Sequence, residues 1–253
     1  MKNLNLRRII SIFAGIASIM AAVSLTVFAE DENASKNKSG SFQEASMIEE
    51  VPKANSVWSD SLAKYRNDDQ VEHLIFVQWI RGTSNAKIQV YEKDKSWNNA
   101  WSIVLECPGY VGRNGIKADK KEGDSATPSG DFGVLTAFGI KKNPGTKLDW
   151  LDVTEDLWCP DAEGPDYNKI VSTKNGGMAE GEHLIEYSPQ YNYAMFLDYN
   201  KECKPKEGSA IFFHCIGPKE YTGGCVAVSE ENMKEILKIF GKYDRVIIAP
   251  YSE

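Results

Sequence analysis

The stretch VEHLIFVQWIRGTSNAKIQVYEKD (residues 71–94) decides the fold class. Its first ten residues are mostly apolar, as in a buried strand, and its last nine alternate apolar with polar side chains. Between these runs lies Gly-Thr-Ser-Asn (82–85), which is typical of a turn. The stretch therefore predicts a β-hairpin with strands at 71–80 and 86–94.

Further short strands are predicted outward from this hairpin, and loops rich in glycine and proline join them. Their ranges are 101–109, 193–200, 209–215 and 245–251. Short strands with such connections indicate a mainly β domain.

One helix is predicted near the C-terminus. Ser229 is suited to the N-cap, Glu230 and Glu231 complement the positive end of the helix, and Gly241 ends it. Its apolar stripe consists of Met233, Ile236, Leu237 and Phe240.

The chain divides into three predicted segments. Residues 1–29 are basic and then apolar, as in a signal peptide. The apolar run at 9–29 is also long enough to span a bilayer, so an uncleaved membrane anchor is the alternative. Residues 30–55 are polar and predict a flexible spacer, and 56–253 predict one folded domain. In either case we expect the folded part to be exported.

Charge and short motifs exclude several classes of protein. The chain has 29 basic and 36 acidic residues, and loss of 1–29 would leave 26 basic residues against 36 acidic ones. This acidic balance without a basic cluster predicts no nucleic-acid partner. No GxGxxG, Walker or HExxH pattern occurs, so we expect no cofactor and no metal.

A histidine and a cysteine delimit the stretch HCIGPKEYTGGC (214–225). If 209–215 is a strand, its side chains alternate, so His214 and Cys215 point in opposite directions. Cys215, with its apolar neighbours, is then a core residue with an unreactive thiol.

Cys225 has a different setting, because Gly223 and Gly224 precede it. Glycines beside a nucleophile allow close approach of a substrate and free N–H groups for an oxyanion. The loop of ten residues after His214 is long enough to bring the imidazole to Cys225 as a catalytic pair. A metal site and two unrelated core residues are the alternatives, although two glycines in a row would weaken a packed strand.

Five stretches together resemble the L,D-transpeptidase catalytic domain family of the YkuD type. They are GYVGRNGI with KKEGDSATPSGDFGV (109–116 and 120–134), YNYAMFLDYN with GSAIFFHC (191–200 and 208–215), and YTGGCVAVSEENMKEIL (221–237). The resemblance covers about residues 70–250 and implies a β-sandwich-like catalytic fold with a few short helices.

The resemblance also implies a reaction. Cys225 would be the nucleophile, His214 the general base, and N–H groups near Gly223, Gly224 and Cys225 the oxyanion hole. Members of the family form a thioester with a peptidoglycan stem peptide and release D-alanine. An amine of a second stem then completes a 3→3 cross-link, in cell-wall biogenesis that maintains cell shape outside the cytoplasm.

The sequence departs from the usual family motif at two positions. A histidine is usual where Gly223 stands, and an arginine or asparagine where Ala227 stands, so Thr222-Gly223-Gly224-Cys225 resembles a divergent subgroup. The alternatives are therefore a carboxypeptidase or endopeptidase acting on the same peptides, or an inactive wall-binding module.

The sequence says less about substrate-binding residues and about the other cysteines. Thr222, His183 and Arg113 are candidates for substrate binding. For His183 a loop position without a role is the favoured interpretation, and a turn role explains Arg113 at least as well. Five cysteines are an odd number for an exported protein, and the sequence does not predict whether Cys107, Cys159 or Cys203 forms a disulfide.

Overall fold

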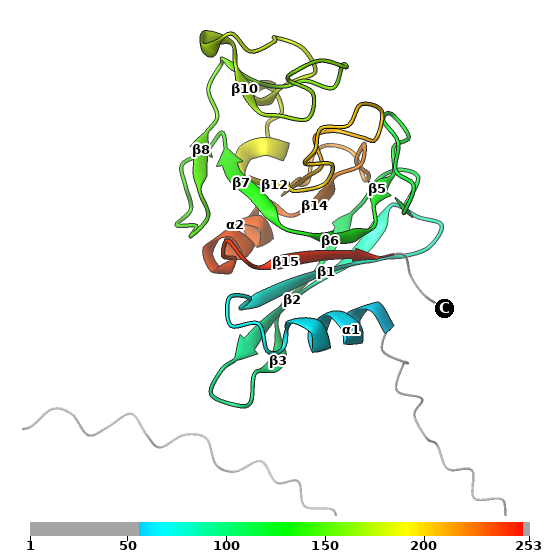
Figure 1. Cartoon of the computed structure of the whole chain (residues 1–253), viewed down its shortest axis with the longest axis vertical. Helices are drawn as coiled ribbons and strands as arrows, with labels where there is room; N and C mark the ends of the chain where they lie inside the picture. Colours follow the sequence, from blue (N-terminus) through cyan, green and yellow to red (C-terminus); the bar gives the residue numbers. More distant parts are fainter. Residues whose placement is uncertain (1–55, 250–253) are drawn as a thin grey trace, which may run out of the picture. The chain divides into compact units, whose positions relative to one another are not determined.

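The computed structural model of the protein describes residues 56–249 (Figure 1). The predicted signal peptide and spacer lie outside these residues. Strands dominate the described part, which contains two α-helices, so the mainly β prediction is confirmed. None of the helices between residues 56 and 249 has the length and apolar character needed to cross a bilayer.

Most strands belong to one large, curled sheet. In spatial order its strands are β6 (Gly130–Phe132), β15 (Arg245–Ala249), β1 (His73–Trp79), β2 (Asn85–Asp94), β3 (Ala100–Tyr110), β14 (Val226–Val228), β13 (Phe212–Cys215), β12 (Ala194–Leu197), β7 (Val134–Gly139) and β8 (Trp150–Asp152). A smaller sheet contains β10 (Val171–Ser172), β9 (Leu157–Cys159) and β11 (Glu182–His183), and β4 (Ile116–Lys117) pairs with β5 (Thr127–Pro128). The helices are α1 (Ser56–Tyr65), α2 (Glu230–Ile239) and three short 3₁₀ turns, η1 (Thr173–Asn175), η2 (Leu184–Glu186) and η3 (Gln190–Asn192).

The predicted hairpin is present as β1 and β2. The two strands pair antiparallel with Val77 opposite Ile88, and β2 continues into an antiparallel pair with β3. On its other edge β1 pairs with β15 in parallel, which places the first and the last strand of the described residues side by side.

The two α-helices contact opposite faces of the β1 region. Leu74 and Phe76 pack with α1 through Trp58, whereas Ile75 and Val77 face the core that contains α2. This alternation follows from the pleat of β1, and it explains why the strand is apolar on both sides. The residues predicted for the apolar stripe of α2 are fully buried: Met233, Ile236, Leu237 and Phe240. Ser229 caps the helix by accepting a hydrogen bond from the Asn232 N–H at 3.2 Å.

Strand β13 separates two hydrophobic clusters in the same way. Phe213 and Cys215 face the main core with α2, and Phe212 faces a second cluster together with Cys225. The predicted alternation is therefore confirmed within β13, although the strand begins at Phe212 and not at residue 209. The second cluster also contains Leu157 and Leu184, from the segments around the small sheet. This side of β13 carries the pocket described below.

Asp244 fixes the loop before β15 to the start of β1. Its carboxylate is 2% exposed and accepts hydrogen bonds from the N–H groups of Glu72, His73 and Gly241 at 2.7–2.8 Å. The Nδ1 atom of His73 lies 2.9 Å from the same carboxylate. This network sets the relative position of two neighbouring parallel strands.

Replacement of Asp244 by alanine should therefore lower the free energy of unfolding substantially. Loss of one member of a buried charged network typically costs about 3–5 kcal/mol, because its partners remain buried without hydrogen bonds. Urea denaturation of Asp244→Ala against Asp119→Ala, which removes an exposed carboxylate, measures the difference. Equal stability of the two variants would contradict this role.

Candidate active site

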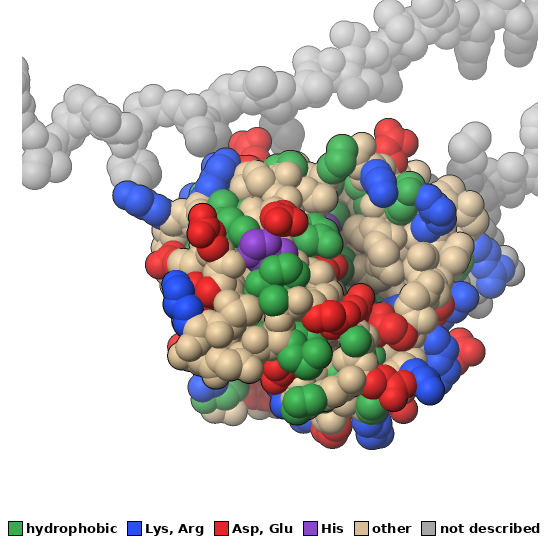
Figure 2. Space-filling model, turned by 90° about the horizontal axis from the view of Figure 1, so that it is seen from above, with side chains coloured by type: hydrophobic (Ala, Val, Ile, Leu, Met, Phe, Trp, Pro, Cys, Tyr) green, Lys and Arg blue, Asp and Glu red, His purple; other side chains and the backbone are tan. Residues whose placement is uncertain are grey.

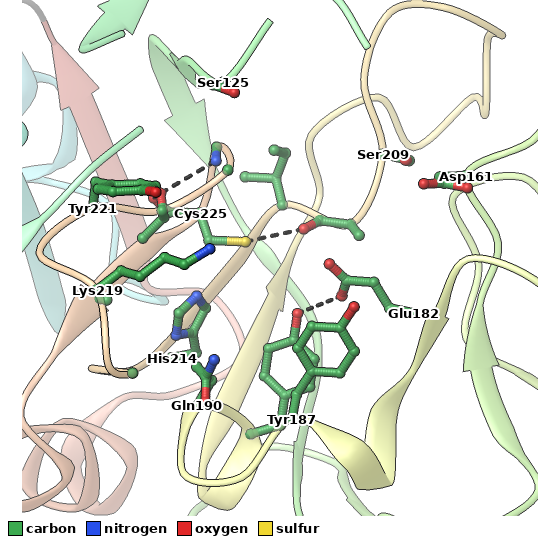
Figure 3. Close-up of a pocket in the computed structure, with 18 of the residues that line it drawn as sticks. Ser125, Asp161, Glu182, Tyr187, Gln190, Ser209, His214, Lys219, Tyr221 and Cys225 are labelled. Atoms are coloured by element: carbon green, nitrogen blue, oxygen red, sulfur yellow. Dashed lines mark hydrogen bonds between the residues drawn. The ribbon is translucent and has the colours of Figure 1, made fainter. Parts of the chain in front are cut away.

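Cys225 and His214 reach one pocket from two neighbouring parallel strands. His214 lies in β13 and pairs with Ala227 of β14, and Cys225 directly precedes β14. Cys225 therefore lies beside Phe212, whose backbone N–H donates to the Cys225 Sγ at 3.3 Å. The side chains of Cys225 and His214 line a cavity of about 430 Å³ (Figure 3).

The hydrogen bond of His214 defines its tautomer. Its Nδ1 lies 2.7 Å from the backbone carbonyl oxygen of Cys215, and a carbonyl oxygen can only accept a hydrogen bond. Nδ1 therefore carries the proton, and in the neutral ring Nε2 keeps a free lone pair. That nitrogen has the electronic state that a general base requires.

The thiol of Cys225 is hydrogen-bonded to the backbone rather than to His214. It donates to the carbonyl oxygen of Ala210 at 3.1 Å. Ala210 has a left-handed backbone (φ +50°), and its N–H donates to Asn168 Oδ1 at 3.0 Å. Figure 3 shows the imidazole of His214 on the other side of the thiol from this carbonyl. The sulfur must leave Ala210 before its proton can pass to the imidazole.

Burial keeps both groups neutral at rest. Burial and, second, the nearby Glu182 carboxylate raise the pKa of the Cys225 thiol to about 12. Burial lowers the pKa of His214 to about 4, although its hydrogen bond to the Cys215 carbonyl opposes this effect. The thiolate–imidazolium pair expected for such a site is therefore not the resting state at neutral pH. The pair would have to form as a substrate enters.

Thr222 shapes the glycine loop that precedes Cys225. Its hydroxyl donates to the Cys225 carbonyl oxygen at 2.6 Å and accepts from the Gly224 N–H at 3.2 Å. Among the described residues, the N–H groups of Gly223 and Cys225 have no such partner. These two groups, and not that of Gly224, are thus free to stabilise an oxyanion.

The space at Gly223 is open. A Cβ atom added there would meet no other atom within 4 Å, whereas one at Gly224 would lie 3.1 Å from the Ala126 carbonyl oxygen. A side chain at position 223 would therefore fit without displacing the backbone. Position 223 therefore leaves open space beside the lining of the pocket.

Thr127 connects the Thr-Pro-Ser-Gly segment to the cysteine. Its hydroxyl donates to the Cys225 carbonyl oxygen at 3.1 Å and accepts from the Gly112 N–H at 2.8 Å. Together with Thr222, it gives the Cys225 carbonyl two hydroxyl donors. These bonds hold the backbone of Cys225 from two directions.

An acidic side of the pocket was not predicted from the sequence. Glu182 of β11 accepts a hydrogen bond from the hydroxyl of Tyr191, whose ring meets that of His214 edge-on with centroids 5.6 Å apart. Burial, together with nearby Asp161 and Glu122, raises the pKa of Glu182 to about 7 against the opposing effect of the Tyr191 hydrogen bond. Glu182 is distant in sequence from both Cys225 and His214, and no motif marks it.

His183 lies outside the pocket. It follows Glu182 in β11 and therefore points to the opposite face of the small sheet. Its ring stacks on Trp158 at 4.1 Å, and its two nitrogens contact Glu186 Oε1 at 3.0 Å and the Glu155 carbonyl oxygen at 2.7 Å. These contacts indicate that His183 stabilises the small sheet and the neighbouring loops.

Arg113 lies next to the pocket without lining it. Its guanidinium stacks over the ring of Tyr221 at 4.3 Å and donates to the Tyr221 hydroxyl. Tyr221 and Lys219 belong to the pocket lining. Arg113 therefore contacts a residue of the lining but does not line the pocket itself.

All five cysteines lie in the described residues and are unpaired. Cys215 is fully buried on the other side of β13 from the pocket, and its thiol donates to the Tyr193 carbonyl oxygen at 3.4 Å. Within residues 56–249, no group of three or more His, Cys, Asp or Glu side chains is arranged to hold a metal ion.

Comparison with known proteins identifies a family. The family described as L,D-transpeptidase catalytic domain, of the YkuD type, matches residues 72–248, which is more than half of the chain. The comparison with curated proteins found no match.

Three solved structures are similar over about seven tenths of this chain. The Ldtfm–avibactam carbamoyl enzyme is 15% identical with a TM-score of 0.35, covering 72% of this chain and 50% of that one. An L,D-transpeptidase from Mycobacterium smegmatis is 13% identical with a TM-score of 0.33, covering 71% and 59%. L,D-transpeptidase 1 from Mycobacterium tuberculosis is 10% identical with a TM-score of 0.32, covering 70% and 62%. The chain thus spans less than two thirds of each of these proteins, and TM-scores this low do not establish a shared fold.

The raised pKa of Cys225 predicts the pH dependence of its alkylation. Because only the thiolate reacts, labelling by iodoacetamide should be slow at about pH 6–7 and still increase at about pH 10. Glu182→Gln removes a negative charge that disfavours the thiolate, so it should accelerate labelling several-fold above neutral pH. Peptide mass spectrometry follows Cys225, with the more exposed Cys203 as internal reference. Fast labelling that has already reached a plateau at about pH 6 would contradict the neutral resting state.

Thr222→Val should loosen the glycine loop. Loss of the hydroxyl leaves the Gly224 N–H without its partner and removes one of two donors to the Cys225 carbonyl, at a cost of about 1–3 kcal/mol. Thr222→Ser keeps the hydroxyl and is the matched control. Equal unfolding free energies for the two variants would show that these hydrogen bonds do not hold the loop.

Proposed function

The chain belongs to the L,D-transpeptidase catalytic domain family, and from this premise we propose that it transfers acyl groups of peptidoglycan stem peptides through a thioester on Cys225. The observation that carries the proposal is the shared pocket of Cys225 and His214 at the β13–β14 pair. The free Nε2 lone pair of His214 supports its role as the base.

In the first half-reaction, the proton of Cys225 Sγ passes to His214 Nε2 as the sulfur attacks the carbonyl that precedes D-alanine. The N–H groups of Gly223 and Cys225 stabilise the oxyanion of the tetrahedral intermediate. His214 then returns the proton to the leaving nitrogen, the C–N bond breaks, and D-alanine departs. Cys225 remains as a thioester with His214 neutral.

Because both groups are neutral at rest, the proton transfer accompanies the attack instead of preceding it. The entering substrate displaces the thiol from the Ala210 carbonyl, to which it donates at 3.1 Å. The cost of separating charge in a buried site is offset only when the oxyanion forms, so the thiol is kept from other electrophiles.

In the second half-reaction, an amine of a neighbouring stem attacks the thioester and forms the 3→3 cross-link. Attack by water would give an L,D-carboxypeptidase instead. The open space at Gly223 supports entry of a bulky acceptor beside the thioester, which favours transfer over hydrolysis. We place this activity outside the cytoplasm, at the cell wall, with stem peptides as partners and without a cofactor.

The test is incubation of the purified protein with a disaccharide-tetrapeptide that carries diaminopimelate or lysine at the third position, followed by mass spectrometry. We expect a cross-linked dimer, no product with Cys225→Ala, and a rate lower by a factor of about 10²–10⁴ with His214→Gln. Cys215→Ala, on the opposite face of β13, is the control and should form dimer.

The other outcomes have separate meanings. Loss of D-alanine without dimer would indicate the hydrolase. If neither the diaminopimelate nor the lysine tetrapeptide gives a product that depends on Cys225, the proposal of an enzyme is wrong. A wall-binding module is then the remaining alternative.

A further inference from the structure

Glu182 is a carboxylate of the pocket that the reaction described above does not use. Figure 3 shows its side chain extending from β11 toward Cys225, and both residues line the same cavity. Tyr191 donates a hydrogen bond to one of its oxygens. Among the described residues, no lysine or arginine forms an ion pair with it. A carboxylate in this position can receive a cation or a proton from a ligand.

The acidic surroundings of Glu182 strengthen its ability to receive a cation or a proton. Asp161 and Glu122 also line the pocket, and Figure 2 shows acidic side chains across the middle of one face, whereas most lysines and arginines lie nearer its edge. Lys120, the buried cation of the lining, is held by Asp124 at 2.6 Å and does not neutralise Glu182. The titratable groups that face Glu182 are Glu122, Cys159, Asp161, Tyr187, Tyr191 and Cys225.

The second half-reaction needs a proton acceptor in addition to His214. The side-chain amine of a stem peptide is an ammonium ion at neutral pH, and an ammonium nitrogen has no lone pair with which to attack. His214 is required for the proton that the nitrogen loses as the new amide forms. The proton that must be removed before the attack therefore needs another group.

We propose that Glu182 binds the ammonium group of the acceptor stem and takes its first proton, which makes it a third catalytic residue of this site beside Cys225 and His214. The inference rests on the proposed function. Its geometric basis is a carboxylate in the pocket of the thioester, held by Tyr191 and without a cationic partner.

The acceptor nitrogen loses two protons in the second half-reaction. The ammonium gives one proton to Glu182, and the neutral amine attacks the thioester carbonyl. The nitrogen then gives its second proton to His214, the C–S bond breaks, and His214 returns that proton to the Cys225 sulfur. Glu182 finally releases its proton to solvent. The products are the amide, the free thiol and one proton.

The pKa of Glu182 suits both the uptake of the ammonium proton and its release to solvent. At about 7 it lies well above that of an ordinary glutamate, because of burial and, despite the Tyr191 hydrogen bond, the neighbouring acids. The group is therefore a better base than an exposed carboxylate, yet still loses its proton to solvent near neutral pH. Water as acceptor carries no ammonium, so hydrolysis does not need this step.

The experiment compares two acceptors with wild-type protein and Glu182→Gln. One acceptor is the stem peptide itself, with diaminopimelate or lysine, and the other is hydroxylamine, which is mostly unprotonated at neutral pH. For Glu182→Gln we expect dimer formation to fall at least about 10-fold relative to release of D-alanine, and thioester cleavage by hydroxylamine to stay within about 3-fold of wild type. The dimer rate of the variant should continue to rise with pH where that of the wild type has levelled off. Glu186→Gln, an exposed glutamate beside His183, is the matched control and should behave as wild type.

Two results would overturn the inference alone. Either an unchanged ratio of dimer to released D-alanine in Glu182→Gln, or an equal loss with both acceptors, would show that Glu182 does not take the acceptor's proton. Wild-type protein without any Cys225-dependent product would instead overturn the proposed function, and the inference with it.

Discussion

The parallel pairing of β13 with β14 is the constraint on which the pocket depends. It brings residues from before and after a long loop into register, so that Cys225 lies beside Phe212, two residues before His214 on the neighbouring strand. Parallel neighbours need a crossover, and here the chain between them supplies the pocket rim with Tyr221 and the glycine loop. Thr222 then adds local hydrogen bonds that fix the last turn before the cysteine. The position of the thiol is therefore set mainly by backbone contacts.

Burial determines how this pair can react. The same apolar cluster that packs Phe212 and Tyr191 around the site disfavours the charged form of both the thiol and the imidazole. Reactivity then depends on an oxyanion and a substrate that replace the lost hydration, which is the principle of a preorganised site. In an environment without such a ligand, the cysteine is a hydrogen-bonded core residue. In the proposed reaction, this burial protects the thiol until a substrate reaches both the glycine loop and Glu182.

Local patterns in the sequence predict much of this structure, and long-range contacts account for the rest. The β1–β2 hairpin, α2 and the alternation through β13 each depend on periodicity or capping within a short segment. α1 was not predicted, because its sequence SVWSDSLAKY is short and its apolar residues become meaningful only against Phe76. Glu182 is placed by the small sheet, whose strands of two or three residues carry no periodic signal. The partners of His183 and Arg113, likewise, depend on loops that meet only in the folded chain.

The two-residue period of β13 has a consequence for how this site can change in evolution or design. His214 and Cys215 occupy opposite faces of one strand, with the pocket on one side and the main core on the other. Insertion or deletion of one residue in the strand would exchange them, placing a thiol in the pocket and an imidazole in the core. The chain could absorb length changes in the loop between β13 and β14, but not within the strand. Variation in substrate preference is thus expected to accumulate around residues 216–223, while the strand itself accepts only substitutions.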